Sequence, residues 1–528
     1  MATVGHRRAP APPARPSARH PRPPFQRLAR LRARRRARPT GGSDAMTGAP
    51  PPAPFPGERP YRADEGHLFF GREREAGDVA ALWLRSPLTV VHGPAGAGLS
   101  SLLAAGVLPR LRGERGTVAH VAPLVMPADH PSGALTGPTP DEYALIRGWA
   151  PHLRAEAAAE TSLGRALAGP PRPPRLLLAV DQAENAVRAR TTGALRELLG
   201  ETARRHPTAR LLLAVRSEHL APLLGALPGA PATYRLPPLR PGPAAAALAA
   251  AVAATGVRRI APAAVAALAG RFGRRNDAPV PGSLVQDVAH GLWDAWPPGE
   301  PAAGPDTFAG PGPVRWAAAG IWRAVCRTAA LHDREPADLV AALAADPGPE
   351  RLGDAVAATL TDRHLLADGA LAGPALTAPL RLLARSADER EPYVPSAADW
   401  LDDAAHARAT GSPDLAAHAA LRALTAADRP VDRLTAELLL GDLARDGGRY
   451  ADAEARYRQA AQSAETLGRR ALVGALLTAV GRLRLASGDS PGAARLLHAA
   501  TDRTPGVRAP REDLERLFAA GRAVRRAT

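Results

Sequence analysis

The stretch Gly93-Pro-Ala-Gly-Ala-Gly-Leu-Ser-Ser101 decides the fold of the central part of this chain. It follows a β-rich run, Pro87–His92, and leads into an apolar segment with a helical pattern. A glycine-rich turn between a strand and a helix gathers backbone N–H groups at one point, and the helix N-terminus adds positive potential, so such a loop binds phosphate. Three glycines supply the backbone freedom and close approach that the turn needs: Gly93, Gly96 and Gly98.

The residues after the last glycine decide how strongly such a loop can hold a nucleotide. In P-loops a lysine contacts the β- and γ-phosphates and the next residue, a serine or threonine, ligates Mg²⁺. Here Ser100 stands at the hydroxyl position, with Ser101 behind it, but Leu99 stands at the lysine position. The loss removes a charge-assisted contact worth roughly 1.5–3 kcal/mol in binding. The chain contains no lysine at all, so only an arginine could replace it.

Short apolar runs alternate with helical patterns along the first half of the chain. This alternation predicts an α/β fold, a parallel sheet with helices on both faces. The predicted strands are Pro87–His92, Val118–Val125, Arg175–Val180 and Arg210–Val215. No strand is expected in the stretch that follows Pro243, which is rich in alanine and helical in pattern.

Two of the predicted strands end in residues suited to nucleotide chemistry. Asp181 ends the third, where a carboxylate can hold Mg²⁺ together with Ser100, and Glu184 follows, where an acid could orient an attacking water. Arg216 ends the fourth, where a cation could sense the γ-phosphate. Two simpler interpretations remain open: Glu184 could be a surface acid, and Arg216 could pair with a neighbouring carboxylate.

Several motifs, in order, resemble the bacterial novel STAND NTPases, a class of P-loop signalling ATPases. They are Pro60-Tyr-Arg, Leu68-Phe-Phe-Gly-Arg-Glu-Arg-Glu75, Ala105-Gly-Val-Leu-Pro109, Val180-Asp-Gln-Ala-Glu184, Leu236-Pro-Pro-Leu239 and Leu284–Trp293. The resemblance covers about residues 60–296, with a weaker winged-helix-like echo at 355–385. It implies bound ATP or ADP with Mg²⁺, Gly71 and Arg72 near the base and sugar, and a switch that controls the exposure or self-assembly of attached modules.

The sequence departs from that family at four places. The most important is Leu99; the others are Ala183, Asn185 and Ser217-Glu218-His219. Together they favour a protein whose hydrolysis is weak or absent.

The last part of the chain contains an internal repeat with a period of 40 residues. One unit has Gly441, Gly448, Ala453, Tyr457 and Ala460, and the next has Gly481, Gly488, Ala493, Leu497 and Ala500. The pattern resembles tetratricopeptide (TPR) repeats, in which small residues let two antiparallel helices approach closely. Because the TPR period is 34, about six extra residues are expected between units. Generic helical hairpins remain an alternative.

These observations predict the following organisation. We expect a disordered Arg/Pro-rich tail (1–58), a P-loop core (59–240), a helical lid (241–296), a linker (297–314), a helical or winged-helix-like region (315–393), TPR-like repeats (395–510) and a C-terminal helix or tail (511–528). The tail could bind nucleic acid, have no role, or be absent if translation begins at Met46.

Composition excludes several classes of protein. Residues 1–45 hold twelve Arg and one Asp, so the remaining chain carries only +6 of the net charge of +17, and a nucleic-acid partner is not expected. The single cysteine, Cys326, excludes an intrachain disulfide framework. The absence of a long apolar run and of a secretory signal favours a cytoplasmic protein without a membrane span. Arg in place of every Lys is typical of a GC-rich, actinobacterial-like genome.

Three functions remain open from the sequence. The first is a nucleotide-binding signalling switch with impaired hydrolysis and a protein partner on its TPR-like repeats. The second is a catalytically dead scaffold for protein interactions. The third, a DNA-associated regulator, depends only on the winged-helix-like echo.

Overall fold

The computed structural model describes residues 53–527, apart from 58, 169–174, 274–277, 298 and 346–348. Most of the expected disordered tail lies outside the described residues. In its described part, Phe55 is buried and its ring lies 6.4 Å from that of Trp293, centroid to centroid. Apolar packing orders the chain from there.

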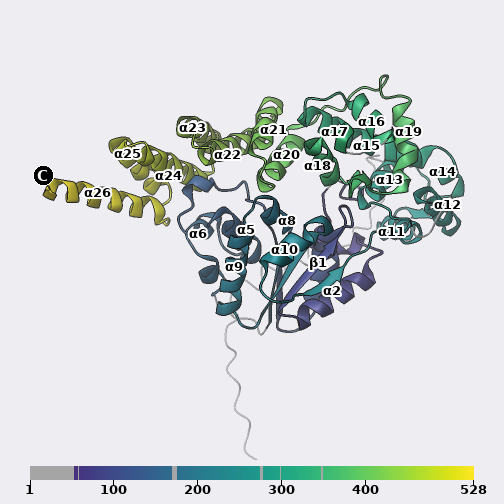
Figure 1. Cartoon of the computed structure of the whole chain (residues 1–528), viewed down its shortest axis with the longest axis horizontal. Coiled ribbons are helices and arrows are strands. Elements are labelled where there is room, and N and C mark those ends of the chain that lie inside the picture. The colour runs from purple at the N-terminus through teal and green to yellow at the C-terminus, as the bar shows by residue number, and fades with distance from the viewer. Residues whose placement is uncertain are drawn as a thin grey trace, which may run out of the picture. The chain divides into compact units, whose positions relative to one another are not determined.

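A five-stranded parallel sheet forms the centre of the first half of the described chain (Figure 1). Its strand order is β2 (Thr117–Pro123), β3 (Arg175–Asp181), β4 (Ala209–Arg216), β1 (Leu88–Gly93) and β5 (Ala232–Arg235). The first four strands agree with prediction to within two residues. The fifth was not predicted, because a four-residue run of Ala-Thr-Tyr-Arg is too short and too polar to give a strand pattern.

Both faces of this sheet are covered by helices, as predicted. Alternate residues of β3 face opposite sides: Leu176 and Leu178 join one apolar cluster, and Leu177 joins the other. The first cluster is completed by α5 (Pro140–Trp149) and α9 (Thr192–Arg205). The second is completed by α2 (Glu73–Arg85) and the helix after the phosphate loop, made up of α3 (Leu99–Ser101), η2 (Leu102–Val107) and α4 (Leu108–Leu111).

The helical lid and the region after it share one apolar cluster, so they form a single body and not two domains joined by a linker. The helices are α11 (Pro241–Ala254), α12 (Pro262–Phe272), α13 (Gly282–Asp294), α15 (Gly312–Leu331), α16 (Pro336–Ala345), α17 (Pro349–Leu352), α18 (Asp354–Asp362) and α19 (Thr377–Ala384). A short hairpin, β8 (Leu366–Ala367) with β9 (Ala370–Leu371), follows α18.

The segment predicted to be a linker, 297–314, has secondary structure in its described part. Strand β7 (Ala302–Ala303) pairs with β6 (Arg259–Ile260), which also corrects the expectation that strands end at Pro243. Helix α14 (Pro305–Ala309) then buries Phe308 completely. This segment is ordered because its few apolar residues, Ala303 and Phe308, are buried although prolines and glycines surround them in the sequence.

The last part of the described chain is a row of helix pairs (Figure 1). The pairs are α20 (Ala397–Ala409) with α21 (Pro413–Ala426), α22 (Pro430–Asp446) with α23 (Tyr450–Thr466), and α24 (Arg470–Ala486) with α25 (Ser490–Arg503), followed by α26 (Ala509–Ala527). A Cβ on Gly441 would lie only 2.5 Å from the Tyr457 ring, so glycine is what lets these two helices approach.

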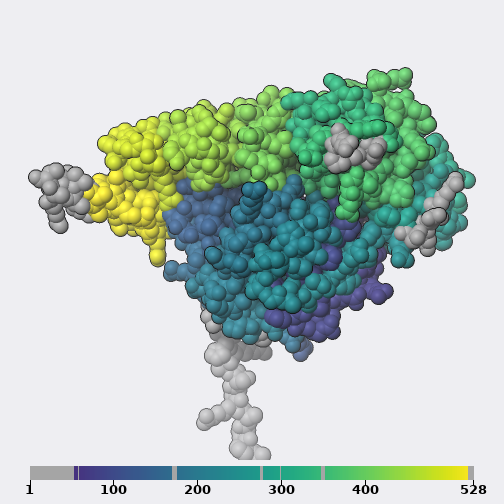
Figure 2. All heavy atoms as spheres, in the orientation of Figure 1, coloured from purple at the N-terminus to yellow at the C-terminus, as the bar shows by residue number. Residues whose placement is uncertain are grey.

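The 40-residue period has a different origin from the one expected. Helices α22, α23 and α24 each have 17 residues, and only three residues separate one from the next. The additional residues thus lengthen the helices and not the connections between repeats. In Figure 2 the yellow-green surface of these repeats meets the blue surface of the core directly.

Candidate functional site

The phosphate loop lies between β1 and α3, as the sequence indicates. Gly96 and Gly98 have backbone φ angles of +76° and +91°, which residues that carry a side chain rarely adopt. Gly93 is needed for a different reason, because a Cβ there would lie 2.9 Å from the carbonyl oxygen of Leu236. The turn therefore depends on glycine at all three positions.

Ser100 and Asp181, the residues predicted to hold Mg²⁺, are brought together. The Asp181 carboxylate accepts the Gln182 N–H at 3.0 Å. Burial raises the pKa of Asp181, and the neighbouring Ser100 hydroxyl opposes this rise. A carboxylate thus lies at the end of β3 beside the hydroxyl at the start of the loop's helix.

The neighbours of Ser100 have other contacts. Leu99 packs against the apolar cluster between the sheet and α2, which includes Val91 and Leu102. The Ser101 hydroxyl accepts the backbone N–H of Tyr61 at 3.2 Å. Leu99 therefore contributes to packing, and Ser101 fastens the segment that precedes α2.

Arg72 stabilises the backbone of the loop through hydrogen bonds. Its buried guanidinium donates to the carbonyl oxygens of Ala97 at 3.2 Å and Pro237 at 2.8 Å, and it forms a 2.8 Å ion pair with Glu75. Gly71 has a φ of +82°, and a Cβ there would lie 2.9 Å from the Ala247 side chain. These contacts hold the loop; the predicted place of both residues near a base and sugar stays a prediction.

Glu184 and Arg216 face each other beside the loop. The Arg216 Nε lies 3.3 Å from the Glu184 carboxylate, and its Nη1 donates to Asp362 at 2.5 Å. Burial raises the pKa of Glu184 to about 7, although the charge of Arg216 opposes the rise. The structure thus gives Arg216 the carboxylate partners that the simpler interpretation of this residue requires.

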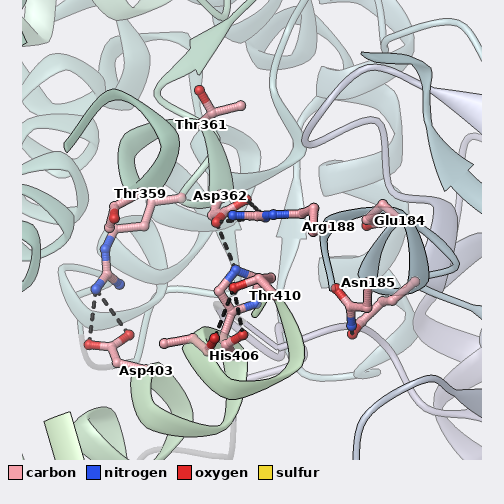
Figure 3. A network of polar contacts seen from close by, with 12 residues as sticks. Glu184, Asn185, Arg188, Thr359, Thr361, Asp362, Asp403, His406 and Thr410 are labelled. Atoms are coloured by element: carbon pink, nitrogen blue, oxygen red, sulfur yellow. Dashed lines mark hydrogen bonds and ion pairs between the residues drawn. The ribbon is translucent and has the colours of Figure 1, made fainter. Parts of the chain in front are cut away.

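Asp362, at the end of α18, is the centre of this network (Figure 3). It pairs with Arg188 of α8 (Glu184–Arg188) at 3.0 Å, with Arg216, and with His406 of α20 at 2.7 Å. Burial alone would raise the pKa of Asp362, but the bond from His406 and the two arginines hold it well below its usual range. One carboxylate therefore ties the P-loop core to the first repeat helix.

His364, two residues further on, covers the phosphate loop. A Cβ on Gly96 would lie 3.1 Å from its ring, and the Gly96 carbonyl accepts the N–H of Gly282 at 3.1 Å. The His364 Nδ1 is shielded from solvent and has no hydrogen-bond partner in the described part of the chain. Burial, aided by Arg216, lowers its pKa to about 4, so the ring is neutral at pH 7.

Sequence reasoning did not predict these contacts. The residues come from three parts of the chain, and none belongs to a motif of fixed spacing: Arg188 in α8, Asp362 and His364 at the end of α18 and just after it, and His406 in α20. The one local signal is the polar run Thr361–His364 between an apolar helix and the β8–β9 hairpin.

We compared the sequence of the chain with models of known protein families and with curated proteins. A sequence model described as Novel STAND NTPase 1 matches residues 54–296. No curated protein matches the chain. None of the helices in the described ranges has both the length and the apolar character needed to cross a bilayer.

Three solved structures are similar to the chain at low sequence identity. A Walker-type ATPase of Pyrococcus abyssi is 15% identical, with a TM-score of 0.37, and the match covers 61% of this chain and 98% of that one. The ORC2 protein of Aeropyrum pernix is 11% identical (TM-score 0.35; 60% and 95%). A STAND protein with a tetratricopeptide repeat sensor from Pyrococcus horikoshii is 12% identical (TM-score 0.31; 85% and 60%).

The P-loop at the end of β1, the acidic end of β3, the five-stranded parallel sheet and the family match agree with one another. Residues 54–296 are a STAND-class P-loop domain of the Novel STAND NTPase 1 family, followed by a helical region of packed helix pairs.

Proposed function

We propose that this protein is a nucleotide-controlled switch that binds ATP or ADP with Mg²⁺ at the phosphate loop and hydrolyses ATP slowly or not at all. The observation that carries the proposal is the ion pair of Arg216 with Asp362 next to His364, whose shielded Nδ1 lies over Gly96 without a partner. A buried polar atom without a partner is costly. In the tautomer that carries its proton on Nδ1, the ring would donate to a phosphate oxygen held by the loop.

The residues at the loop fit a nucleotide with Mg²⁺. Ser100 and Asp181 would hold the metal, which would draw charge from the phosphate oxygens. The N–H groups of the loop and the helix N-terminus at Leu99 would receive the phosphates. Arg72 already fixes the loop's backbone through Ala97, so binding would require little rearrangement there.

Slow turnover follows from two features. Leu99 leaves the loop without the cation that stabilises transferred charge. Glu184 has a pKa near 7 and its carboxylate faces Arg216, so it is poorly placed to orient water while that pair persists.

The third phosphate of ATP would alter the network around Asp362. Arg216 is the cation best placed to meet a γ-phosphate, and it can do so fully only by releasing Asp362. ADP makes no such demand. We therefore expect ADP to favour the arrangement described here and ATP to weaken the contacts of Asp362 and His364, which would free the repeats for a partner or for self-assembly.

The scaffold is the second candidate, and two contacts favour it. Leu99 is packed among apolar residues, and Arg72 satisfies loop carbonyls without any ligand. The third candidate, a DNA-associated regulator, has only the β8–β9 hairpin after α18 in its favour.

Calorimetry with ATP and with ADP in the presence of Mg²⁺, on the full chain, separates these functions. The switch predicts micromolar binding by the wild type, weaker binding by Asp181→Ala, and binding tightened roughly 10- to 150-fold by Leu99→Lys, which restores about 1.5–3 kcal/mol. Asp354→Ala, an exposed acid at the far end of α18, is the control. Binding by Leu99→Lys alone would mean a scaffold whose site has been lost, and no binding by any variant would overturn the proposal.

A further inference from the structure

A short segment of the P-loop domain lies against the helix pairs. It runs from Pro131 to Leu135, between β2 and α5, and includes the single turn η3 (Ser132–Ala134). Ser132 and Ala134 are each 4% exposed, and Ala134 belongs to the apolar cluster of the helix pairs. We call the surface that it covers the repeat groove, formed by α20, α22 and α24, the first helix of each pair, with Tyr457 of α23.

The repeat groove holds the main chain of this segment more than its side chains. The Ser132 N–H donates to Asp442 at 3.0 Å. The Arg482 guanidinium donates to the carbonyl oxygens of Gly133 at 3.3 Å and Leu135 at 2.9 Å. A side chain of the segment is also hydrogen-bonded, because Arg408 donates to the Ser132 hydroxyl at 3.0 Å.

The groove admits only small residues at its centre. A Cβ added to Gly133 would lie 3.1 Å from the Tyr457 hydroxyl, 3.2 Å from the Ala479 side chain and 3.4 Å from that of Arg445. The contact therefore favours glycine at this position, and the burial of Ser132 and Ala134 favours small residues on either side of it.

The polar groups of the groove are held in place by the repeats themselves. Asp442 is fully buried and also accepts from Arg408 at 2.8 Å and from the Tyr457 hydroxyl at 2.7 Å. Arg482 is held at 2.7 Å by Asp513 of α26. A site organised in this way needs no help from the segment that occupies it, and preorganised groups bind a replacement at low entropic cost.

The segment fits the groove imperfectly at its N-terminal side. The Nε2 of His130 is buried and has no partner in the described part of the chain. Next to it lies an open hollow of about 380 Å³, lined by Asp129, His130, Glu156 and residues 468–472. An incoming chain could begin to displace the segment from this side.

We propose that the repeat groove is a peptide-binding site that the protein's own residues 131–135 fill in cis, and that its partner is a protein presenting an exposed Ser/Thr-Gly-Ala-like turn. The partner's main chain would take over the bonds to Asp442 and Arg482. Partner binding and the contact with the P-loop domain would thus exclude each other. This inference rests on the proposed function only in assigning partner binding to the repeats.

The test uses a fluorescent peptide with the sequence of residues 128–137 and the full chain, with binding followed by fluorescence anisotropy. Gly133→Trp should expel the covering segment and increase peptide affinity roughly tenfold or more over wild type. In that background Arg482→Ala should weaken binding roughly tenfold. Arg484→Ala, on the same helix but paired with Glu454 and Asp489, should leave it unchanged.

A second variant guards against misfolding of Gly133→Trp. Ser132→Pro removes the N–H that Asp442 accepts, at the first position of η3, where proline is tolerated. It should also expose the groove, whereas Ser132→Ala should have a smaller effect. A peptide with tryptophan in place of its glycine should not bind any of these chains.

Absence of peptide binding to both opened chains, or binding that Arg482→Ala leaves intact, would overturn the inference and mean that the contact is a fixed interface. Nucleotide calorimetry on the same chains keeps the two proposals apart. Nucleotide binding without peptide binding would overturn this inference alone, and peptide binding without nucleotide binding would overturn only the switch.

Discussion

The phosphate loop and the repeat groove are each covered by a short segment from another part of the chain, but the two covers are held differently. Over the loop, one carboxylate, Asp362, pairs with two arginines and with the His406 ring. Over the groove, residues 131–135 are held mostly through main-chain N–H and C=O groups. The first cover is sensitive to charge, as a nucleotide switch requires, and the second to backbone shape, as a peptide site requires.

The largest effect that would sharpen this contrast is expected from Asp362→Asn. Removing one partner of a buried ion network costs about 3 kcal/mol or more, because the arginines lose their counter-charge. Hydrogen exchange of residues 360–366 should therefore rise roughly 100-fold, while that of 131–135 changes less. Asp354→Asn, at the exposed end of the same helix, should change neither. Equal loosening of both segments would show that the two covers are one unit.

The charge dependence of the first cover predicts a pH effect at Glu184. The pKa of this carboxyl is raised to about 7 from 4.5. Its contribution to the free energy of unfolding is therefore fully present below pH 4.5 and is lost as the pH rises through 7. Glu184→Gln, which cannot ionise, should gain stability relative to wild type over this range, by up to about 3 kcal/mol. Denaturant unfolding of both proteins at pH 4.5 and 8 measures the difference. A difference that does not vary with pH would refute the assignment.

The smallest effect is expected at the second cover, from Tyr457→Phe. The change removes one of three hydrogen bonds to Asp442, which keeps Arg408 and Ser132, so the cost should be about 1 kcal/mol. Exchange of residues 131–135 should rise about fivefold, with residues 360–366 unaffected. Tyr450→Phe, exposed at the start of the same helix, is the control. A larger response at 360–366 would break the contrast between the covers.

The sequence predicted the P-loop architecture because its signals are local. Continuous apolar runs of about six residues identify strands buried on both faces, and glycines at fixed spacing identify the turn at the end of β1. The repeats were found for the same reason, since Gly441 and Tyr457 are 16 residues apart on two consecutive helices that touch. Strand β5 and helix α14 were missed because each is short and lies among prolines, where local patterns carry little information.

Only some of the contacts in the candidate site could be predicted from such local signals. Ser100 and Asp181 could be paired in advance, because parallel strands end at the same edge of a sheet. The partner of Arg216 could not be named, because Asp362 lies 146 residues further along the chain and no spacing rule connects them.

The sequence by itself determined the strand–loop–helix module, the presence of a leucine at position 99 and the helical repeats, since each depends on neighbouring residues and their periodicity. Only the tertiary structure decided what covers each site: Asp362 and His364 over the loop, and residues 131–135 in the repeat groove. Those contacts depend on how separately folded elements pack, and packing brings together residues whose distance in sequence carries no information about their distance in space.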